Sequence, residues 1–147
     1  MTATNVTPPR LHWAIVLLLT VATLGIFYII WMFVQARWIK RIDPESNATS
    51  LLVICVVLEL GGQILIETSA DGSGTSVAGG LLLLAGTVIG VVAFFSMRRS
   101  MLDYFNRQQP QGLRLSAALT FFLGALYLQH HMTRIAKWKE TGVLPPQ

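Results

Sequence analysis

The stretch VAGGLLLLAGTVIGVVAFFSM, residues 77–97, contains no charged residue. At about 1.5 Å per residue, a helix of this length is about 30 Å long, which matches the hydrocarbon core of a lipid bilayer. It predicts a membrane-spanning helix. The stretch therefore decides the fold class, an all-α integral membrane helical bundle.

Two other stretches have a similar character. Residues 13–34 contain no charged residue, and residues 51–66 are apolar except at Glu59 and Gln63. Both are predicted to cross a bilayer, the second with the residues that follow it. The first is longer than the apolar part of a cleavable secretory signal, which is about 7–15 residues. The short polar loop at 69–76 predicts an antiparallel hairpin of the second and third helices.

A fourth apolar stretch, residues 115–128, is shorter. Its length is equally typical of a re-entrant or interfacial segment, so whether it crosses stays open. We predict a single membrane domain with three spans and a shorter fourth helix. The expected helices cover about residues 11–42, 50–69, 77–107 and 113–138.

The composition fits few other classes of protein. Hydrophobic residues make up 53% of the chain and charged residues 12%, and the mean hydropathy is +0.58. Soluble domains carry about 25% charged residues, so neither a soluble enzyme nor a disordered chain fits. The sequence also lacks a phosphate-binding loop, an HExxH motif and a dinucleotide fingerprint. We therefore expect a protein that is not an enzyme.

Neither a metal nor a cofactor is expected. Cys55 is the single cysteine, which excludes an intrachain disulfide framework and a Cys-rich metal site. His130 and His131 are adjacent, about 100° apart on a helix, so they cannot readily bind one ion from the same face. We interpret them as histidines at a helix end.

The basic residues predict an orientation. The first and third loops together hold seven of the eleven Lys and Arg residues if all four helices cross, and their side holds ten if the fourth does not. Positive charge favours the cytoplasmic side. Both loops are therefore predicted to be cytoplasmic in a bacterial inner membrane, with the N-terminus outside.

Tryptophans and basic residues at the ends of the apolar stretches predict anchors at the membrane interface. Each basic residue there contributes about 1 kcal/mol of attraction to anionic headgroups. The lipid bilayer is thus the expected partner, and nucleic acid is not, because topology already requires these charges. The predicted anchors are Trp13, Trp31, Arg37, Trp38, Lys40, Arg41, Arg98, Arg99 and Trp138.

Glu59 lies near the middle of a predicted span, where an ionised acid costs about 3 kcal/mol. Cys55, Glu59, Gln63 and Glu67 are spaced by four, which predicts one polar stripe that faces protein or water. Two interpretations stay open. Glu59 either packs helices with Gln63 as its hydrogen-bond partner, or it handles a proton or cation.

Glycines in the two central helices predict close helix packing. Gly61 and Gly62 follow Glu59, and Gly86 and Gly90 form a G-x-x-x-G pattern. The contact could be within the chain, with a second copy, or with a membrane partner protein.

A short motif occurs twice. The sequence LGIFY at residues 24–28 is echoed by LGALY at residues 123–127, and a basic cluster with a tryptophan follows each. The echo suggests that the first and fourth helices share a role, flanking the central hairpin.

The stretch TLGIFYIIW, residues 23–31, resembles the T-F-G-I-Y-x-x-x-W signature of small bacterial inner-membrane proteins, grouped as a multi-helix domain family of unknown function. Leu24 and Phe27 depart from the signature, and Tyr28 follows at once. The resemblance implies a bacterial integral membrane protein without known catalysis and supplies no functional residues. We predict a non-enzymatic accessory or structural role. The alternative is a small oligomeric proton- or cation-coupled transporter or channel that uses Glu59.

Overall fold

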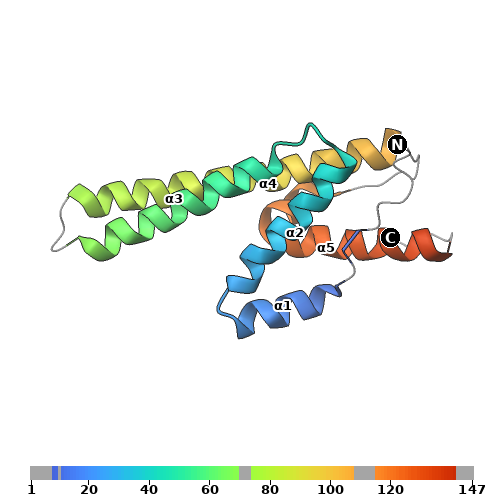
Figure 1. The fold of residues 1–147 in the computed structure, drawn as a ribbon, viewed down its shortest axis with the longest axis horizontal. Helices are drawn as coiled ribbons and strands as arrows, with labels where there is room; N and C mark the ends of the chain where they lie inside the picture. Colours follow the sequence, from blue (N-terminus) through green and yellow to red (C-terminus); the bar gives the residue numbers. More distant parts are fainter. Residues whose placement is uncertain (1–7, 10, 70–73, 108–114, 142–147) are drawn as a thin grey trace.

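Five helices make up the described part of the chain. The computed structural model describes residues 8–9, 11–69, 74–107 and 115–141, which contain no strand. The all-α prediction is therefore confirmed, with five helices where about four were expected. The helices are α1 (Trp13–Ala22), α2 (Ile26–Ile42), α3 (Ala48–Thr68), α4 (Gly74–Arg107) and α5 (Ala117–Thr141) (Figure 1).

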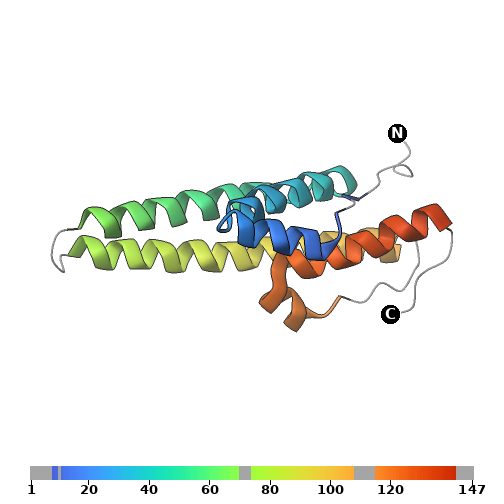
Figure 2. The same cartoon turned by 90° about the horizontal axis from the view of Figure 1, so that it is seen from below.

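The helices α3 and α4 form a long antiparallel hairpin (Figures 1 and 2). They begin and end close to the boundaries predicted for residues 50–69 and 77–107. The helix α3 and residues Ser76–Arg107 of α4 are the two helices in the described chain that are long and apolar enough to cross a membrane.

The prediction of one continuous helix over residues 11–42 is wrong. The chain turns sharply at residues 23–25, which we call the first elbow, and α2 folds back beside α1 (Figure 1). Leu24 (φ 52°) and Gly25 (φ 94°) adopt left-handed backbone conformations, which glycine adopts at little cost. The 10-residue α1 is about 15 Å long, too short to cross a bilayer.

The last helix is also bent at a glycine. Gly124 has φ 44° and ψ −119°, which interrupts α5; we call residues 123–125 the second elbow. The helix begins at Ala117, and the residues predicted to start it, Leu113 and Arg114, lie outside the described residues. The two copies of the repeated motif thus coincide with the two elbows.

The core lies at one end of the hairpin. The helices α1, α2 and α5 gather beside the second half of α4, and the half of the hairpin near its tip extends away from them (Figures 1 and 2). Burial of each large apolar side chain there contributes about 1.5–3 kcal/mol. The largest fully buried apolar side chains in this core are Phe105, Ile39, Leu52, Met97, Met101, Leu128 and Met132.

Candidate functional site

Two buried glutamines join α2 to α5. Gln35 and Gln129 are both fully buried, and the Gln35 Nε2 donates to the Gln129 Oε1 at 3.2 Å. The same Nε2 donates to the carbonyl oxygen of Ala125 at 2.9 Å. The Trp31 Nε1 also donates to the Gln129 Oε1, at 3.1 Å. Gln129 therefore satisfies two buried donors from α2, and we call this cluster the amide node.

The amide node also holds the segment just before α1. The Gln129 Nε2 donates to the carbonyl oxygens of Pro9 at 3.1 Å and Leu11 at 2.6 Å, just before α1. The Gln35 Oε1 is buried and has no hydrogen-bond partner among the described residues. Because a buried polar group without its partner costs about 1–3 kcal/mol, the node fixes how the N-terminal segment, α2 and α5 pack.

The residues of the stretch that resembles the family signature build the first elbow. The Thr23 Oγ1 accepts from the Phe27 N–H at 2.9 Å and donates to the Leu19 carbonyl at 2.7 Å, which joins the two helices. Gly25 supplies the left-handed turn. A Cβ atom at Gly124 would lie 3.0 Å from the Tyr28 hydroxyl oxygen, so Tyr28 packs directly on the second elbow.

Glu59 is half-buried between α3 and α4, one helical turn after the buried Cys55. Gln63 and Glu67 are exposed. Only the first half of the predicted four-residue polar stripe, Cys55 and Glu59, therefore faces α4. The reason is geometric: each step of four residues rotates about 40° around the helix, and three steps carry Glu67 away from α4. In the described part of the chain, no hydrogen bond joins the Glu59 and Gln63 side chains.

Three of the four predicted packing glycines lie in the α3–α4 contact. A Cβ atom at Gly62 would lie 2.8 Å from the Gly79 carbonyl oxygen, and one at Gly90 would lie 3.1 Å from the Cys55 Sγ. A Cβ atom at Gly86 would lie 2.9 Å from the Glu59 Cγ. Gly61 lies at the edge of this contact, where a Cβ atom would be 4.0 Å from the Leu82 Cδ1 of α4.

The prediction of interface anchors is wrong for two tryptophans. Trp31 (6% exposed) and Trp38 (3% exposed) are buried by contacts with α5 and α4, including the stacking of Trp38 on Phe105. Trp13 is exposed, as expected for an anchor. Trp138 belongs to α5, but its side chain lies outside the described part of the chain.

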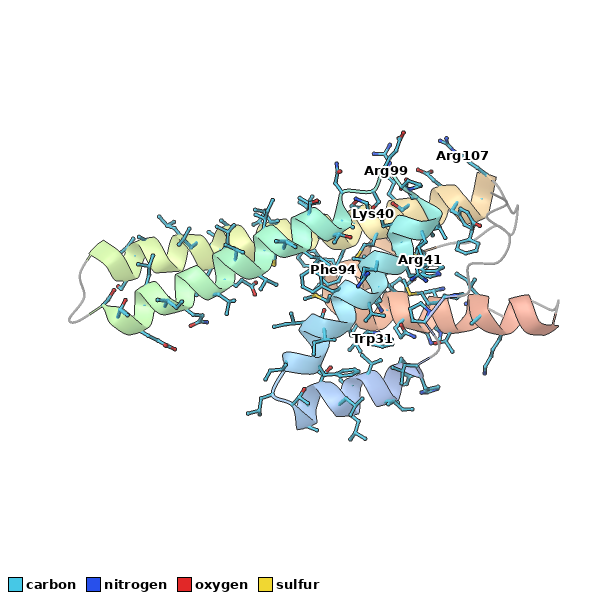
Figure 3. All side chains as sticks on the ribbon, viewed as in Figure 1. Trp31, Lys40, Arg41, Phe94, Arg99 and Arg107 are labelled. Carbon is cyan, nitrogen blue, oxygen red and sulfur yellow. The ribbon has the colours of Figure 1, made fainter. Side chains whose placement is uncertain are left out.

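Three of the basic residues predicted as anchors, Lys40, Arg41 and Arg99, lie in the part of the molecule away from the hairpin tip (Figure 3). Arg37, Lys40 and Arg41 are exposed on α2, and Arg99 is exposed on α4. Arg98 instead fastens α4 to the residues before α5, because its Nε and Nη2 donate to the Leu115 carbonyl oxygen at 3.0 and 2.6 Å.

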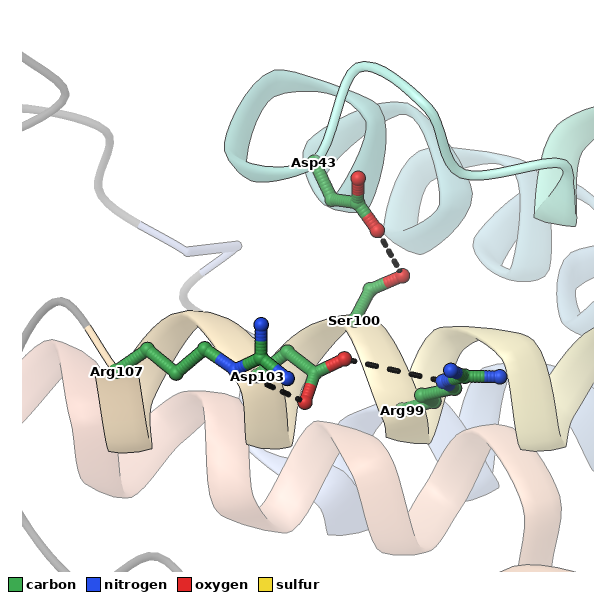
Figure 4. Close-up of polar contacts among 5 residues, drawn as sticks. All are labelled: Asp43, Arg99, Ser100, Asp103 and Arg107. Atoms are coloured by element: carbon green, nitrogen blue, oxygen red, sulfur yellow. Dashed lines mark hydrogen bonds and ion pairs between the residues drawn. The ribbon is translucent and has the colours of Figure 1, made fainter.

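A polar groove of about 600 Å³ lies between the α2–α3 loop and α4. The Ser100 Oγ donates to the Asp43 Oδ2 at 2.6 Å, which pins the loop to α4 (Figure 4). The Asp103 carboxylate lies 3.8 Å from the Arg99 Nε and 3.9 Å from the Arg107 Nε. The sequence alone does not predict the pairing of Asp43 with Ser100, which are 57 residues apart. Charged and apolar residues are interleaved after Met97, and this pattern indicates a polar face on α4.

Metal ligation is not supported by the geometry. Within the described residues, no group of three or more His, Cys, Asp or Glu side chains could hold a metal ion. His131 is buried and its ring lies edge-on to Tyr127 at 4.7 Å, whereas His130 is exposed.

The chain belongs to the family described as Domain of unknown function (DUF4234), whose family model matches residues 12–103. This region covers α1 to α3 and most of α4. The chain matches no curated protein and no solved structure.

Proposed function

We propose that the chain is an integral protein of a bacterial inner membrane, anchored by the α3–α4 hairpin, with a non-enzymatic structural or accessory role. The observation that supports this proposal is the exposure of the apolar side chains of this hairpin. Only 17% of the most apolar stretch of α3 and 22% of that of α4 are buried. An apolar core helix of a soluble protein would be mostly buried, so a lipid environment is the physical explanation.

The exposed side chains continue along the hairpin toward its tip. Monomeric soluble proteins rarely expose contiguous apolar patches larger than a few hundred Å². Placing such a surface among acyl chains removes its contact with water, at about 25 cal/mol per Å². The large apolar side chains exposed on the hairpin are Val53, Ile54, Val57, Leu60, Ile64, Ile66, Val77, Leu81, Leu84, Val88 and Val92.

The distribution of charge supports one orientation. The Lys and Arg residues of the described helices lie on α2, on the second half of α4 and on α5, away from the hairpin tip. By the positive-inside rule, this end faces the cytoplasm and the tip faces the other side. The resemblance of residues 23–31 to a signature of bacterial proteins supports the bacterial inner membrane.

One hollow on α2 suits an anionic lipid headgroup. Arg37, Arg41 and Val34 line a space of about 390 Å³ together with Pro9 and Trp38. Both arginines and Val34 are exposed. Guanidinium groups pair with phosphate oxygens, and an apolar neighbour accommodates the start of an acyl chain. The lipid bilayer with anionic headgroups is therefore the proposed partner.

Cysteine labelling in membrane vesicles tests the proposed span. The single native cysteine, Cys55, is buried, so the unmodified chain is the unlabelled control. Thr68→Cys at the hairpin tip and Lys40→Cys on α2 both place a thiol at an exposed position. A membrane-impermeant maleimide should label the two positions from opposite faces. Labelling of both from the same face, or recovery of the chain without detergent in the soluble fraction, would overturn the proposal.

The second candidate function is a proton- or cation-coupled transporter or channel that uses Glu59. One observation favours it: Glu59 is half-buried between two helices of the proposed span, next to Cys55. A carboxylate at membrane depth is a common element of ion pathways. The Glu59→Gln variant described in the Discussion separates this function from a packing role.

A further inference from the structure

We propose that the two elbows are a pair of wedges that enter the same leaflet of the bilayer, from the basic side, without crossing it. The partner of this surface is the layer of acyl chains closest to the headgroups. The inference rests on the proposed function, because it requires that α3 and α4 cross the bilayer. It goes beyond that function by assigning lipid contact and topology to α1, α2 and α5.

The residues at the elbows are among the most exposed apolar side chains of the molecule. At the first elbow, Leu24 is 95% exposed and Val21 is 68% exposed. Beside the second elbow, Phe122 is 79% exposed and Phe121 is 56% exposed. Sharp turns on a water-facing surface usually carry polar residues, whereas each of these turns contains an exposed leucine and is flanked by exposed valine or phenylalanine. Their composition fits lipid better than water.

The backbone of the first elbow is able to enter lipid. A non-helical turn is unfavourable in hydrocarbon when its N–H groups have no acceptors. Here every N–H group from residue 23 to residue 29 donates to an acceptor in residues 19–25. Six donate to backbone carbonyl oxygens, and the N–H of Phe27 donates to the Thr23 Oγ1. The donors are thus satisfied without water.

Both elbows point in the direction of the hairpin tip and end well short of it (Figures 1 and 2). The opposite end of the same helices carries the basic residues, including Lys40 and Arg41 on α2 (Figure 3). This arrangement places the apolar turns on the membrane side and the charges on the aqueous side. The elbows therefore continue the lipid-facing surface of the hairpin into one leaflet.

The two elbows are held as one unit. The Tyr28 hydroxyl packs on Gly124, and Phe94 of α4 lies against the same glycine, 3.2 Å from the position of a Cβ atom. The Gln35 side chain holds the Ala125 carbonyl oxygen in the bent segment of α5. Because these contacts fix the elbows to α4, they hold the wedges at a constant depth relative to the span.

Depth-dependent fluorescence quenching tests the wedges. Leu24→Cys and Phe122→Cys change exposed side chains and should not disturb the fold. Each carries a bimane label and is reconstituted into vesicles whose lipids hold bromine either near the headgroups or near the chain ends. Both labels should lose more fluorescence with bromine near the headgroups than with bromine near the chain ends. Leu84→Cys on the hairpin is the deep control, and Lys40→Cys is the aqueous control.

Stronger quenching of the Leu24→Cys label from the bilayer centre would contradict the wedges. If residues 11–42 formed one membrane-crossing helix, Leu24 would lie near the bilayer centre and would be quenched best by bromine near the chain ends. That result, or the absence of quenching at both elbows, would overturn the inference.

A second measurement separates this inference from the proposed span. An epitope tag at the N-terminus should be accessible from the same face as Lys40→Cys. A tag accessible from the face of Thr68→Cys would overturn the wedges and leave the hairpin span intact. If instead Thr68→Cys and Lys40→Cys were labelled from one face, the proposed span itself would fail.

Discussion

Gln35 and Gln129, 94 residues apart in the chain, share a hydrogen bond of 3.2 Å in the interior of the molecule. Gln35 lies within the region that matches the family model, and Gln129 lies beyond it, on α5. Because Gln129 also accepts from Trp31, the matched region depends on α5 to satisfy its buried donors. The helix α5 is therefore part of the fold's core.

Replacing Gln129 should destabilise the protein more than an exposed glutamine does. Gln129→Leu removes the acceptor of the Trp31 and Gln35 donors and leaves them buried, which costs about 1–3 kcal/mol for each group that finds no new partner. Thermal unfolding in detergent micelles measures the loss. Gln63→Leu is the matched control, because Gln63 is exposed. Equal unfolding temperatures for the two variants would show that the amide node contributes nothing to stability.

Gly62 and its neighbour Gly61 should respond differently to alanine. A Cβ atom at Gly62 would meet the backbone oxygen of Gly79 at 2.8 Å, so α3 and α4 must separate, at about 1–3 kcal/mol. At Gly61 a Cβ atom would lie 4.0 Å from the Leu82 Cδ1, in ordinary van der Waals contact, and alanine should be neutral or slightly stabilising in a helix. Unfolding in micelles compares the two variants. A Gly62→Ala protein as stable as Gly61→Ala would contradict this packing.

The Glu59→Gln variant separates the two functional interpretations of Glu59. A packing role predicts little change in expression, oligomeric state and thermal stability, because glutamine keeps the size and shape of glutamate and can still form hydrogen bonds. A coupling role predicts that proton-linked flux in proteoliposomes is lost while the fold survives. The measurement is flux with a pH-sensitive dye inside the vesicles. Flux that the unmodified chain shows and Glu59→Gln retains would reject the transporter hypothesis.

Acidification should destabilise the fold through His131. Burial, and then the nearby positive charge of Arg134, lower the pKa of His131 from 6.5 to about 4. The unfolded chain therefore takes up a proton as the pH falls through about 6.5, whereas the folded chain takes it up only near pH 4, so stability falls across this window. His131→Gln should lose less stability than the unmodified chain between pH 7 and pH 4.5.

Unfolding temperatures measured across this pH range in micelles check the His131 prediction. His130→Gln is the comparison: His130 is exposed and makes the smallest of the three contributions to the lowered pKa of His131, so this variant should keep most of the pH dependence. The same pH dependence in His131→Gln as in the unmodified chain would show that His131 does not carry the effect.

The binding of anionic lipid to the protein should depend on the arginines of α2. The double variant Arg37→Gln and Arg41→Gln removes both guanidinium groups from the hollow beside Val34. Each charge contributes about 1 kcal/mol, so the affinity for anionic lipid should fall by about 30-fold. Native mass spectrometry of the purified protein measures the retained lipid. Arg107→Gln, at the far end of α4, is the control, and equal losses in both variants would contradict a specific site on α2.

Some of the fold was predictable because it depends on local physical chemistry. The hairpin of α3 and α4 follows from the long apolar stretches and the short polar loop between them. A spacing of four also drifts around a helix, so the polar stripe that begins at Cys55 turns away from α4 before it reaches Glu67. Hydropathy could not find the first elbow, because apolar residues continue through Leu24 and Gly25 whether or not the helix continues.

The sequence by itself determined the helical class, the two central helices and the separation of charge from apolar surface. These depend on residue type and on spacing within one helix. Tertiary structure alone decided the rest. The burial of Trp31 and the bend at Gly124 depend on partners about a hundred residues away, namely Gln129 for Trp31 and Tyr28 for Gly124. Only folding brings such partners together, because a left-handed turn and a buried amide are stable where distant contacts offset their cost.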